Sequence, residues 1–130
     1  MGATFLGQET VDGAALFHLR FYRVVPGQSS QVTADIQRLS ALDIYLDANS
    51  YLPLVVSFNV HPDNDASTDI PVRILFGDYR ATNGIQVPFR IQKFLQGSLT
   101  LDLIVAKAAT NSGLPESEFT IPQLLTGGAQ

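Results

Sequence analysis

Hydrophobic and polar residues alternate with a period of two along most of the chain, and the pattern is clearest between Ile70 and Gln96. The apolar positions on either side of Asn83-Gly84 are Ile70, Val72, Ile74 and Phe76 before the pair, and Ile85, Val87, Phe89 and Ile91 after it. Asn-Gly favours a type I′ turn, because both central residues of that turn need a positive φ. The pattern predicts a long antiparallel hairpin with one apolar and one polar face.

The same alternation predicts further strands on both sides of this hairpin. They cover residues 3–9, 14–25, 37–47, 52–61 and 99–105, with a short closing strand at 118–121. About six to seven strands joined by short turns indicate an all-β fold, a strongly curved antiparallel meander or half-barrel with little or no helix. We expect residues 1–122 to form this single domain and residues 123–130 to be a flexible C-terminal tail.

One segment, Gln31 to Asp47, carries two conflicting patterns. Val32, Ile36 and Leu39 have the spacing of a helix face, whereas the residues from Leu42 onward alternate as a strand does. We interpret it as a loop or single turn up to about Ile36, followed by a strand from Gln37 to Asp47.

Composition narrows the class of protein. The 130 residues suit one domain, and 45% hydrophobic with 15% charged residues indicates a folded chain. The net charge of −4 and the scattered Lys and Arg residues argue against nucleic acid, since phosphate binding needs a clustered basic surface. With no cysteine there is neither a disulfide nor a Cys-based metal site. No apolar run approaches the ~20 residues of a membrane span, so the protein is not expected to span a membrane.

The loop from His61 to Asp69 is the densest group of potential metal ligands. Asp63, Asp65, Ser67 and Asp69 imitate the first half of a calcium loop, but residue 68 is Thr instead of Gly and the twelfth position is Ile74 instead of Glu. We favour a solvated turn capped by Asp and Asn side chains over a metal site.

Other polar residues offer little catalytic chemistry. His18 lies on a predicted strand without an evident nucleophile or orienting carboxylate, so we interpret it as structural. Asp78, Tyr79 and Arg80 are expected to form a local ion pair or to cover a strand edge. There is no nucleophile elbow and no phosphate-binding glycine loop. The sequence predicts a protein that is not an enzyme and uses no cofactor and no metal.

The strands point their large apolar side chains to one face. In aqueous solution that face must be shielded from the solvent. The residues we expect on it, as candidates for ligand binding, are Phe17, Leu19, Phe21, Val56, Phe58, Ile74, Phe76, Phe89, Ile91 and Leu101. Two interpretations stay open: an ordinary core, and a hollow that holds an apolar small molecule or lipid. The face can also be buried against another domain of a longer precursor or against a second copy.

Three motifs carry a family resemblance. Residues 78–89 (DYRATNGIQVPF), residues 47–53 (DANSYLP) and residues 111–119 (NSGLPESEF) together resemble the outer-membrane lipoprotein-sorting (LolA/LolB-like) superfamily and its bacterial envelope relatives. The resemblance implies a curved half-barrel that binds lipid or lipoprotein acyl chains on its concave apolar face. It also implies a periplasmic or secreted location. Because Met1-Gly2 leads straight into a strand, we expect the chain to be a mature segment or a fragment of a longer precursor.

Overall fold

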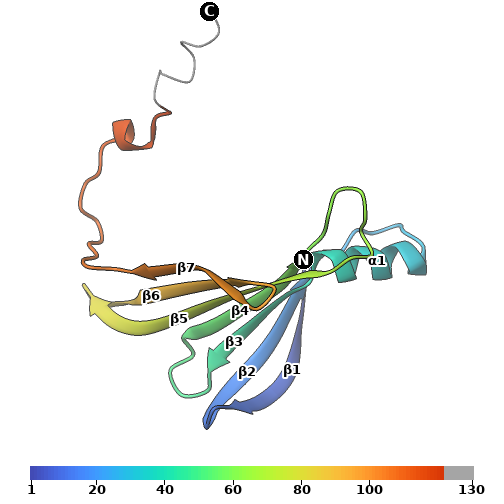
Figure 1. Cartoon of the computed structure of the whole chain (residues 1–130), viewed down its shortest axis with the longest axis horizontal. Coiled ribbons are helices and arrows are strands. Elements are labelled where there is room, and N and C mark those ends of the chain that lie inside the picture. The colour runs from blue at the N-terminus through green and yellow to red at the C-terminus, as the bar shows by residue number, and fades with distance from the viewer. Residues whose placement is uncertain (122–130) are drawn as a thin grey trace, which may run out of the picture.

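The computed structural model describes residues 1–121, which form one antiparallel sheet, a helix beside it and a short 3₁₀ turn (Figure 1). The elements are β1 (Gly2–Val11), β2 (Ala14–Tyr22), α1 (Ser30–Ser40), β3 (Leu42–Asp47), β4 (Pro53–Val60), β5 (Ile70–Thr82), β6 (Ile85–Leu95), β7 (Ser98–Ile104) and η1 (Glu116–Phe119). The strand order β1-β2-β3-β4-β5-β6-β7 is the order of the chain, and every neighbouring pair is antiparallel. The predicted all-β meander is confirmed as a curved sheet that does not close into a barrel.

The β5–β6 hairpin is the longest pair in the sheet. Its turn has φ values of 50° at Asn83 and 80° at Gly84, as a type I′ turn requires. The register runs from Val72 opposite Leu95 to Thr82 opposite Ile85 without a shift. The hairpin predicted from the sequence is therefore confirmed, including its turn.

Register shifts elsewhere explain why the sheet bends. They lie between Phe5 and Gly7 in β1, beside Leu46 where β3 meets β4, and between Lys93 and Phe94 where β6 meets β7. An extra residue in one strand increases the local twist and bends the strand. Two of the shifts lie next to the edge strands β1 and β7, where such irregularity discourages pairing with another chain.

The helix α1 corrects the expectation of a loop and a strand between Gln31 and Ser40. Ser29 caps it, because its hydroxyl accepts a hydrogen bond from the Val32 amide at 3.3 Å. At the other end the Ser40 hydroxyl donates to the Ile36 carbonyl at 2.6 Å. Only after Ala41 does the chain become a strand, so β3 begins at Leu42, later than predicted.

The segment after β7 corrects a second expectation. Residues 116–119 form the 3₁₀ turn η1, where a closing strand over 118–121 was expected. The amides of Glu118 and Thr120 donate locally to the carbonyls of Pro115 and Ser117, at 3.1 and 3.4 Å, and Phe119 is 76% exposed, so this segment does not pair with the sheet. The predicted tail at 123–130 lies outside the described residues.

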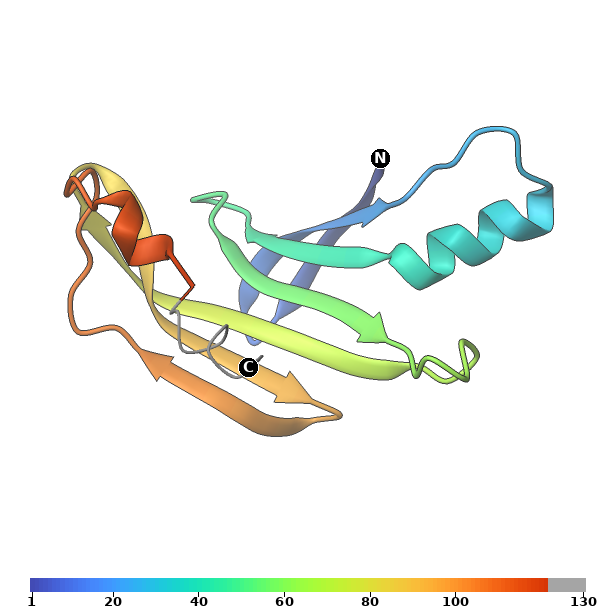
Figure 2. The same ribbon diagram turned by 90° about the horizontal axis from the view of Figure 1, so that it is seen from above.

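The faces of the sheet are left largely uncovered by α1 and by the segment after β7. Figure 1 and Figure 2 show α1 extending beyond one end of the strands and the segment after β7 leaving at the other end. The principal contacts of α1 are with β2. Within residues 1–121 no helix has the length and apolar character needed to cross a membrane. The described part of the chain is thus essentially a single layer.

Candidate functional site

The two faces of the sheet differ in chemistry, and the strand register shows how. Residues directly opposite each other in antiparallel strands point to the same face. One row across the sheet joins Phe21, Leu42, Phe58, Val72 and Leu95, each opposite the next. A second row joins Phe5, Leu19, Ile44, Val56, Ile74, Lys93 and Leu101, and a third joins Phe76, Ile91 and Leu103. We call the surface formed by these rows the apolar face.

The predicted site residues lie together on this apolar face. Phe21 and Phe58 belong to the first row, Leu19, Val56, Ile74 and Leu101 to the second, and Phe76 and Ile91 to the third. Phe17 lies opposite Leu46 and Phe89 is two residues from Ile91, which by strand alternation places both on the same side. Their role in ligand binding stays a prediction.

The sequence analysis left out the centre of this surface. Leu42 and Ile44 from β3, and Val72 from β5, occupy the middle of the first two rows. Val72, with 2% of its surface exposed, is the most buried of them. Their alternation was visible in the sequence, but the strand order needed to place them between β2 and β5 was not.

Much of the apolar face is open to solvent. Leu101 and Leu103 are each nearly half exposed, and Phe5 on the edge strand is more exposed still. Phe17 is sandwiched between neighbours at its end of the sheet, edge-on to Phe5 at 5.9 Å and stacked on Tyr51 at 6.0 Å between ring centroids. Each strand has its principal contacts with its neighbours in the sheet, and β2 also contacts α1.

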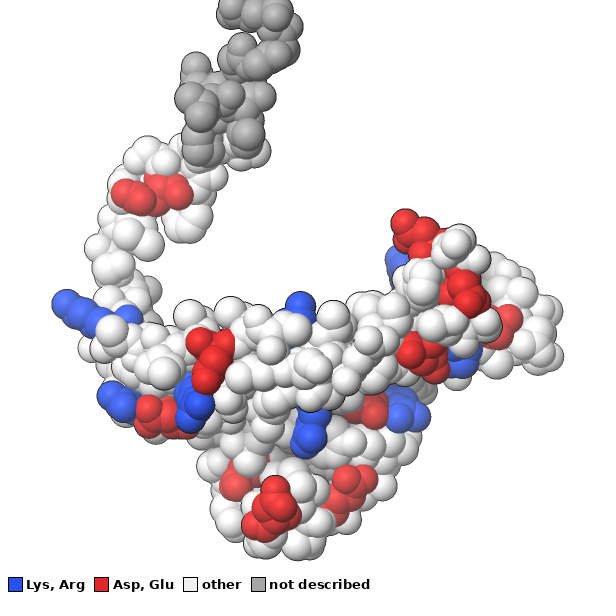
Figure 3. Space-filling view, viewed as in Figure 1, with Lys and Arg blue, Asp and Glu red and all other residues white. Residues whose placement is uncertain are grey.

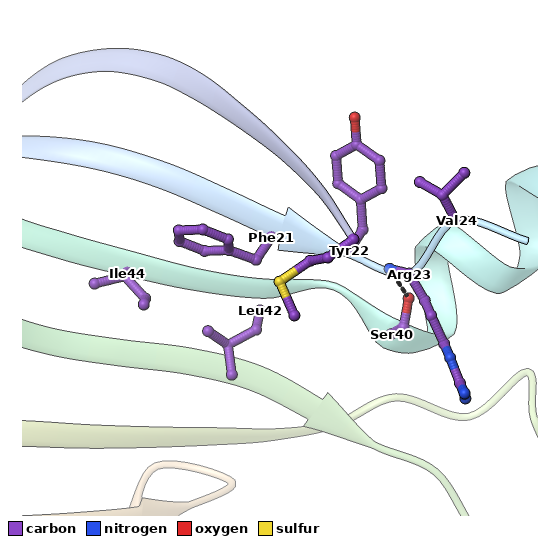
Figure 4. Close-up of a pocket in the computed structure, with 8 residues that line it drawn as sticks. Phe21, Tyr22, Arg23, Val24, Ser40, Leu42 and Ile44 are labelled. Carbon is purple, nitrogen blue, oxygen red and sulfur yellow. Dashed lines mark hydrogen bonds between the residues drawn. The ribbon is translucent and has the colours of Figure 1, made fainter.

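A pocket of about 710 Å³ opens on this face where β2 and β3 meet the end of α1 (Figure 4). Its lining consists of Met1, Phe21, Tyr22, Arg23, Val24, Ser40, Leu42 and Ile44. The volume lies within the range of roughly 300–1,000 Å³ that is common for small-molecule sites. Of the predicted site residues, Phe21 lines this pocket. Its other lining residues were not among the predicted site residues: Ser40 comes from α1, which was not expected, and the rest come from β2, β3 and the residues that flank the strands.

The opposite face is polar and carries the ion pairs. Arg20 holds Asp43 with two hydrogen bonds of 2.6 and 2.8 Å, and Arg90 holds Asp102 with bonds of 3.1 and 2.9 Å. The Arg20 hydrogen bonds hold the pKa of the Asp43 carboxyl below its usual value, against the opposing effect of burial. This face also buries Leu16 and Val55, so the small core of the sheet lies partly under the ion pairs.

His18 is the buried polar residue of this face, with 7% of its surface exposed. Its Nδ1 lies 3.0 Å from Glu9 Oε1 and its Nε2 lies 3.2 Å from Asp43 Oδ2, while its ring stacks on Tyr45 at 4.2 Å between centroids. The sequence did not reveal these carboxylates, because they come from β1 and β3. Both ring nitrogens face carboxylates, which hold the ring in place, and the interpretation of His18 as a structural residue stays a prediction.

The end of the β5–β6 hairpin has the structural role that we expected. Arg80 pairs with Asp78 at 2.8 Å, and the Tyr79 hydroxyl donates a hydrogen bond to the Pro53 carbonyl of β4. The Arg80 guanidinium also lies 4.7 Å from the centroid of the Phe89 ring, which helps to bury that ring.

The His61–Asp69 loop makes its own internal contacts. Asp65 accepts hydrogen bonds from Ser67 and Thr68, as expected for a capped turn, and His61 Nδ1 lies 3.0 Å from the Thr68 carbonyl oxygen and 3.2 Å from Asp69. Arg38 of α1 also binds Asp69 at 3.1 Å, which ties the helix to the loop. Within residues 1–121 no group of three or more His, Cys, Asp and Glu side chains is arranged to hold a metal ion.

Lys and Arg side chains form no patch of their own on the surface shown in Figure 3. In that view most of them lie beside Asp and Glu side chains, acidic side chains gather at the lower end of the sheet and near α1, and broad uncharged areas lie between. The ion pairs of the polar face account for part of this mixing.

The comparisons with known proteins concern the fold. No family model matches the chain, and no curated protein matches it. Among solved structures, the chain is similar to the crystal structure of an outer membrane lipoprotein-sorting protein domain from Vibrio parahaemolyticus, with a TM-score of 0.59 and 16% sequence identity. The match covers 90% of this chain and 45% of that chain, so this chain spans less than half of the other's length. The resemblance predicted from the three motifs is thereby confirmed for the fold.

Proposed function

From a fold shared with an outer membrane lipoprotein-sorting domain, we propose that this protein binds an apolar ligand, a lipid or acyl chain, on the apolar face of its curved sheet. It acts as a binding protein of the bacterial envelope, in the periplasm, and carries out no reaction. The observation that supports this most directly is the pocket of about 710 Å³ on the open apolar face.

The physical argument concerns surface that water penalises. Burying apolar surface contributes about 25 cal/mol per Å². Exposed apolar patches larger than a few hundred Å² are uncommon on monomeric proteins and usually mark a binding site. The second and third rows keep Leu101 and Leu103 exposed beside more sheltered residues such as Ile74 and Ile91. An acyl chain lying along these rows removes that surface from water without requiring any polar partner.

Titration with a neutral apolar fluorophore, N-phenyl-1-naphthylamine, tests the proposal. We expect saturable binding by the monomer. Ile44→Gln should weaken binding severalfold, because it places an amide in the pocket on the apolar face. Ile104→Gln is the control: it makes the same change at a position that is 72% exposed, but its side chain points to the polar face, where it lies across from Arg90. The proposal is wrong if the monomer shows no saturable binding, or if both variants weaken binding equally.

A second candidate function rests on the exposed leucines of the apolar face. β7 exposes Leu99, Leu101 and Leu103. The apolar face can pack against a partner domain or a second copy, which would bury these side chains. Sedimentation equilibrium distinguishes the two functions. A dimer that persists on dilution and dissociates in Leu101→Gln supports the interaction module, whereas a monomer at all concentrations excludes the second copy.

A further inference from the structure

We propose that the pocket at β2, β3 and α1 takes a single-chain amphiphile with an anionic head group, a long-chain carboxylate, and that Arg23 binds the head group. The inference rests on the proposed function and specifies the chemistry of its ligand. Apolar contacts alone would accept any acyl chain. A cation fixed beside them selects for charge and sets the direction in which the chain lies.

The floor of the pocket is apolar and its polar lining groups are already occupied. Phe21, Leu42 and Ile44 form the floor, and Figure 4 shows them along β2 and β3. The Ser40 hydroxyl donates to the Ile36 carbonyl and accepts from the Arg23 amide at 2.8 Å. The Tyr22 hydroxyl lies 3.4 Å from Thr4 Oγ1, and in Figure 4 its ring points away from Leu42. Among the side chains that line the pocket, these contacts leave the Arg23 guanidinium available to a ligand.

Arg23 differs from most arginines of the chain in having no anionic partner. Within residues 1–121, Arg20, Arg38, Arg80 and Arg90 each pair with an aspartate, whereas Arg23 and Arg73 have no carboxylate within 4.0 Å. The hydrogen bond from its amide to Ser40 fixes the Arg23 backbone between the end of β2 and the end of α1. Its side chain extends past Ser40 at the α1 end of the pocket (Figure 4).

This arrangement complements a carboxylate attached to an alkyl chain. A guanidinium offers two parallel N–H donors, which match the two oxygens of a carboxylate. With the head group at Arg23, the chain can lie over Leu42 and Ile44 and continue along the rows of the apolar face. The aliphatic part of the arginine side chain adds to the apolar contact.

Lys93 is the competing position for the head group. It lies within the second row, between Ile74 and Leu101, and so also presents a cation on the apolar face. It is not among the residues that line the pocket. Binding at Arg23 and binding at Lys93 predict different results. If Lys93 bound the head group, substitutions of Arg23 would not change ligand affinity.

The experiment compares two ligands that differ only in the head group. Decanoate and 1-decanol, below their critical concentrations for aggregation, displace N-phenyl-1-naphthylamine from the full chain at neutral pH. Wild type should bind decanoate about three- to tenfold more tightly than decanol, the range expected for a partly solvated charged hydrogen bond. Raising the salt concentration should reduce this preference and leave decanol binding unchanged.

Four variants locate the charge. Arg23→Gln should abolish the preference for decanoate, and Arg23→Lys should retain most of it. Arg73→Gln makes the same change in net charge on the polar face, where Arg73 lies opposite Ser57, and should leave the preference intact. Lys93→Gln should also leave it intact. All three positions are exposed, and a thermal melt of each variant confirms that it folds.

The outcomes separate the inference from the function on which it rests. Equal binding of decanoate and decanol by wild type, or a preference that survives Arg23→Gln, overturns the inference and leaves the proposed function standing. A preference lost in Lys93→Gln but kept in Arg23→Gln overturns the assignment to Arg23. If neither ligand displaces the fluorophore from wild type, the proposed function is itself wrong, and the inference is wrong with it.

Discussion

At the scale of single residues, the turn of the central hairpin depends on backbone conformation and not on contacts. Gly84 has a φ of 80°, and a Cβ atom placed there would meet nothing within 4 Å. Any effect of substituting Gly84 must therefore come from the left-handed conformation, which side chains with a branched Cβ tolerate poorly. Gly77, in the middle of β5, has equal space but no positive φ.

We expect Gly84→Val to lower the free energy of unfolding by about 1–2 kcal/mol or more, because valine resists a positive φ. Chemical denaturation monitored by circular dichroism measures the change. Gly77→Ala is the control and should be close to neutral or slightly stabilising. A Gly84→Val protein as stable as wild type would show that the turn is not of this type.

The Asp43 carboxyl predicts how stability depends on pH. Its pKa is lowered in the folded protein, first by the hydrogen bonds from Arg20 and then by His18, with burial acting in the opposite direction. A depressed folded-state pKa contributes stability that is present above the unfolded pKa of about 3.9. That contribution is lost as the pH falls through the folded value.

Unfolding measured between about pH 5 and pH 2 should therefore show a steeper loss of stability in wild type than in Asp43→Asn. Arg20→Gln removes the largest cause of the shift, so it should also flatten the profile. An Asp43→Asn protein with the wild-type slope would mean that this carboxyl is not strongly perturbed, and that the other hydrogen-bonded aspartates account for acid sensitivity.

At the scale of elements, α1 and the sheet differ in how they are held. No residue of α1 is buried, and Val32 and Leu39 of its apolar stripe are 41% and 38% exposed. The helix is fixed by its cap at Ser29, by the Arg38–Asp69 ion pair and by packing against β2. The strands β4 and β5, in contrast, are hydrogen-bonded on both sides. An element with few buried contacts unfolds locally at a lower free energy than one that is packed and hydrogen-bonded on both sides.

Amide hydrogen exchange should consequently be faster in α1 than in β4 and β5. Ser29→Ala removes the cap, which contributes about 1 kcal/mol to a helix. It should accelerate exchange in α1 roughly fivefold, since 1.4 kcal/mol corresponds to tenfold, and leave β5 unchanged. Equal acceleration in both elements would show that α1 and the sheet unfold as one unit.

At the scale of the whole molecule, the sheet is a single layer, and within the described residues little of the protein packs against its apolar face. The described chain keeps many large apolar side chains partly exposed, and the most buried ones lie at Val72 on one face and at Leu16 and Val55 on the other. A ligand that covers the apolar face adds the missing contacts to several strands at once. Ligand binding should therefore increase the free energy of unfolding of the entire sheet.

We expect a bound decanoate to raise the melting temperature of the whole sheet in one transition. At a free concentration of 100 times Kd, a ligand that binds only the folded state adds about 2.7 kcal/mol. Differential scanning calorimetry over a range of decanoate concentrations measures this. Arg23→Gln should need more ligand for the same shift, and a melting temperature independent of ligand in wild type would contradict binding to the folded sheet.

Much of the fold was available from the sequence because its signals are local. Alternation with a period of two marks which residues of a strand share a face, and Asn83-Gly84 marks the turn by its φ values. The helix was harder to predict, because its stripe of Val32, Ile36 and Leu39 is short and leads directly into the alternation of β3. The prediction of a strand at 118–121 was wrong. Whether a segment pairs with the edge of a sheet depends on where that edge lies, and the residues of the segment do not encode this.

By itself, the sequence determined the strands, the central turn and the set of apolar side chains that share a face, since each depends on neighbours a few residues apart. Only the tertiary structure decided which residues meet across strands: the rows with Leu42 and Ile44 at their centre, the carboxylates of Glu9 and Asp43 around His18, and the pocket beside Arg23. Those contacts join segments far apart in the chain, and their positions follow from register, bulges and the path of α1, which no local pattern encodes.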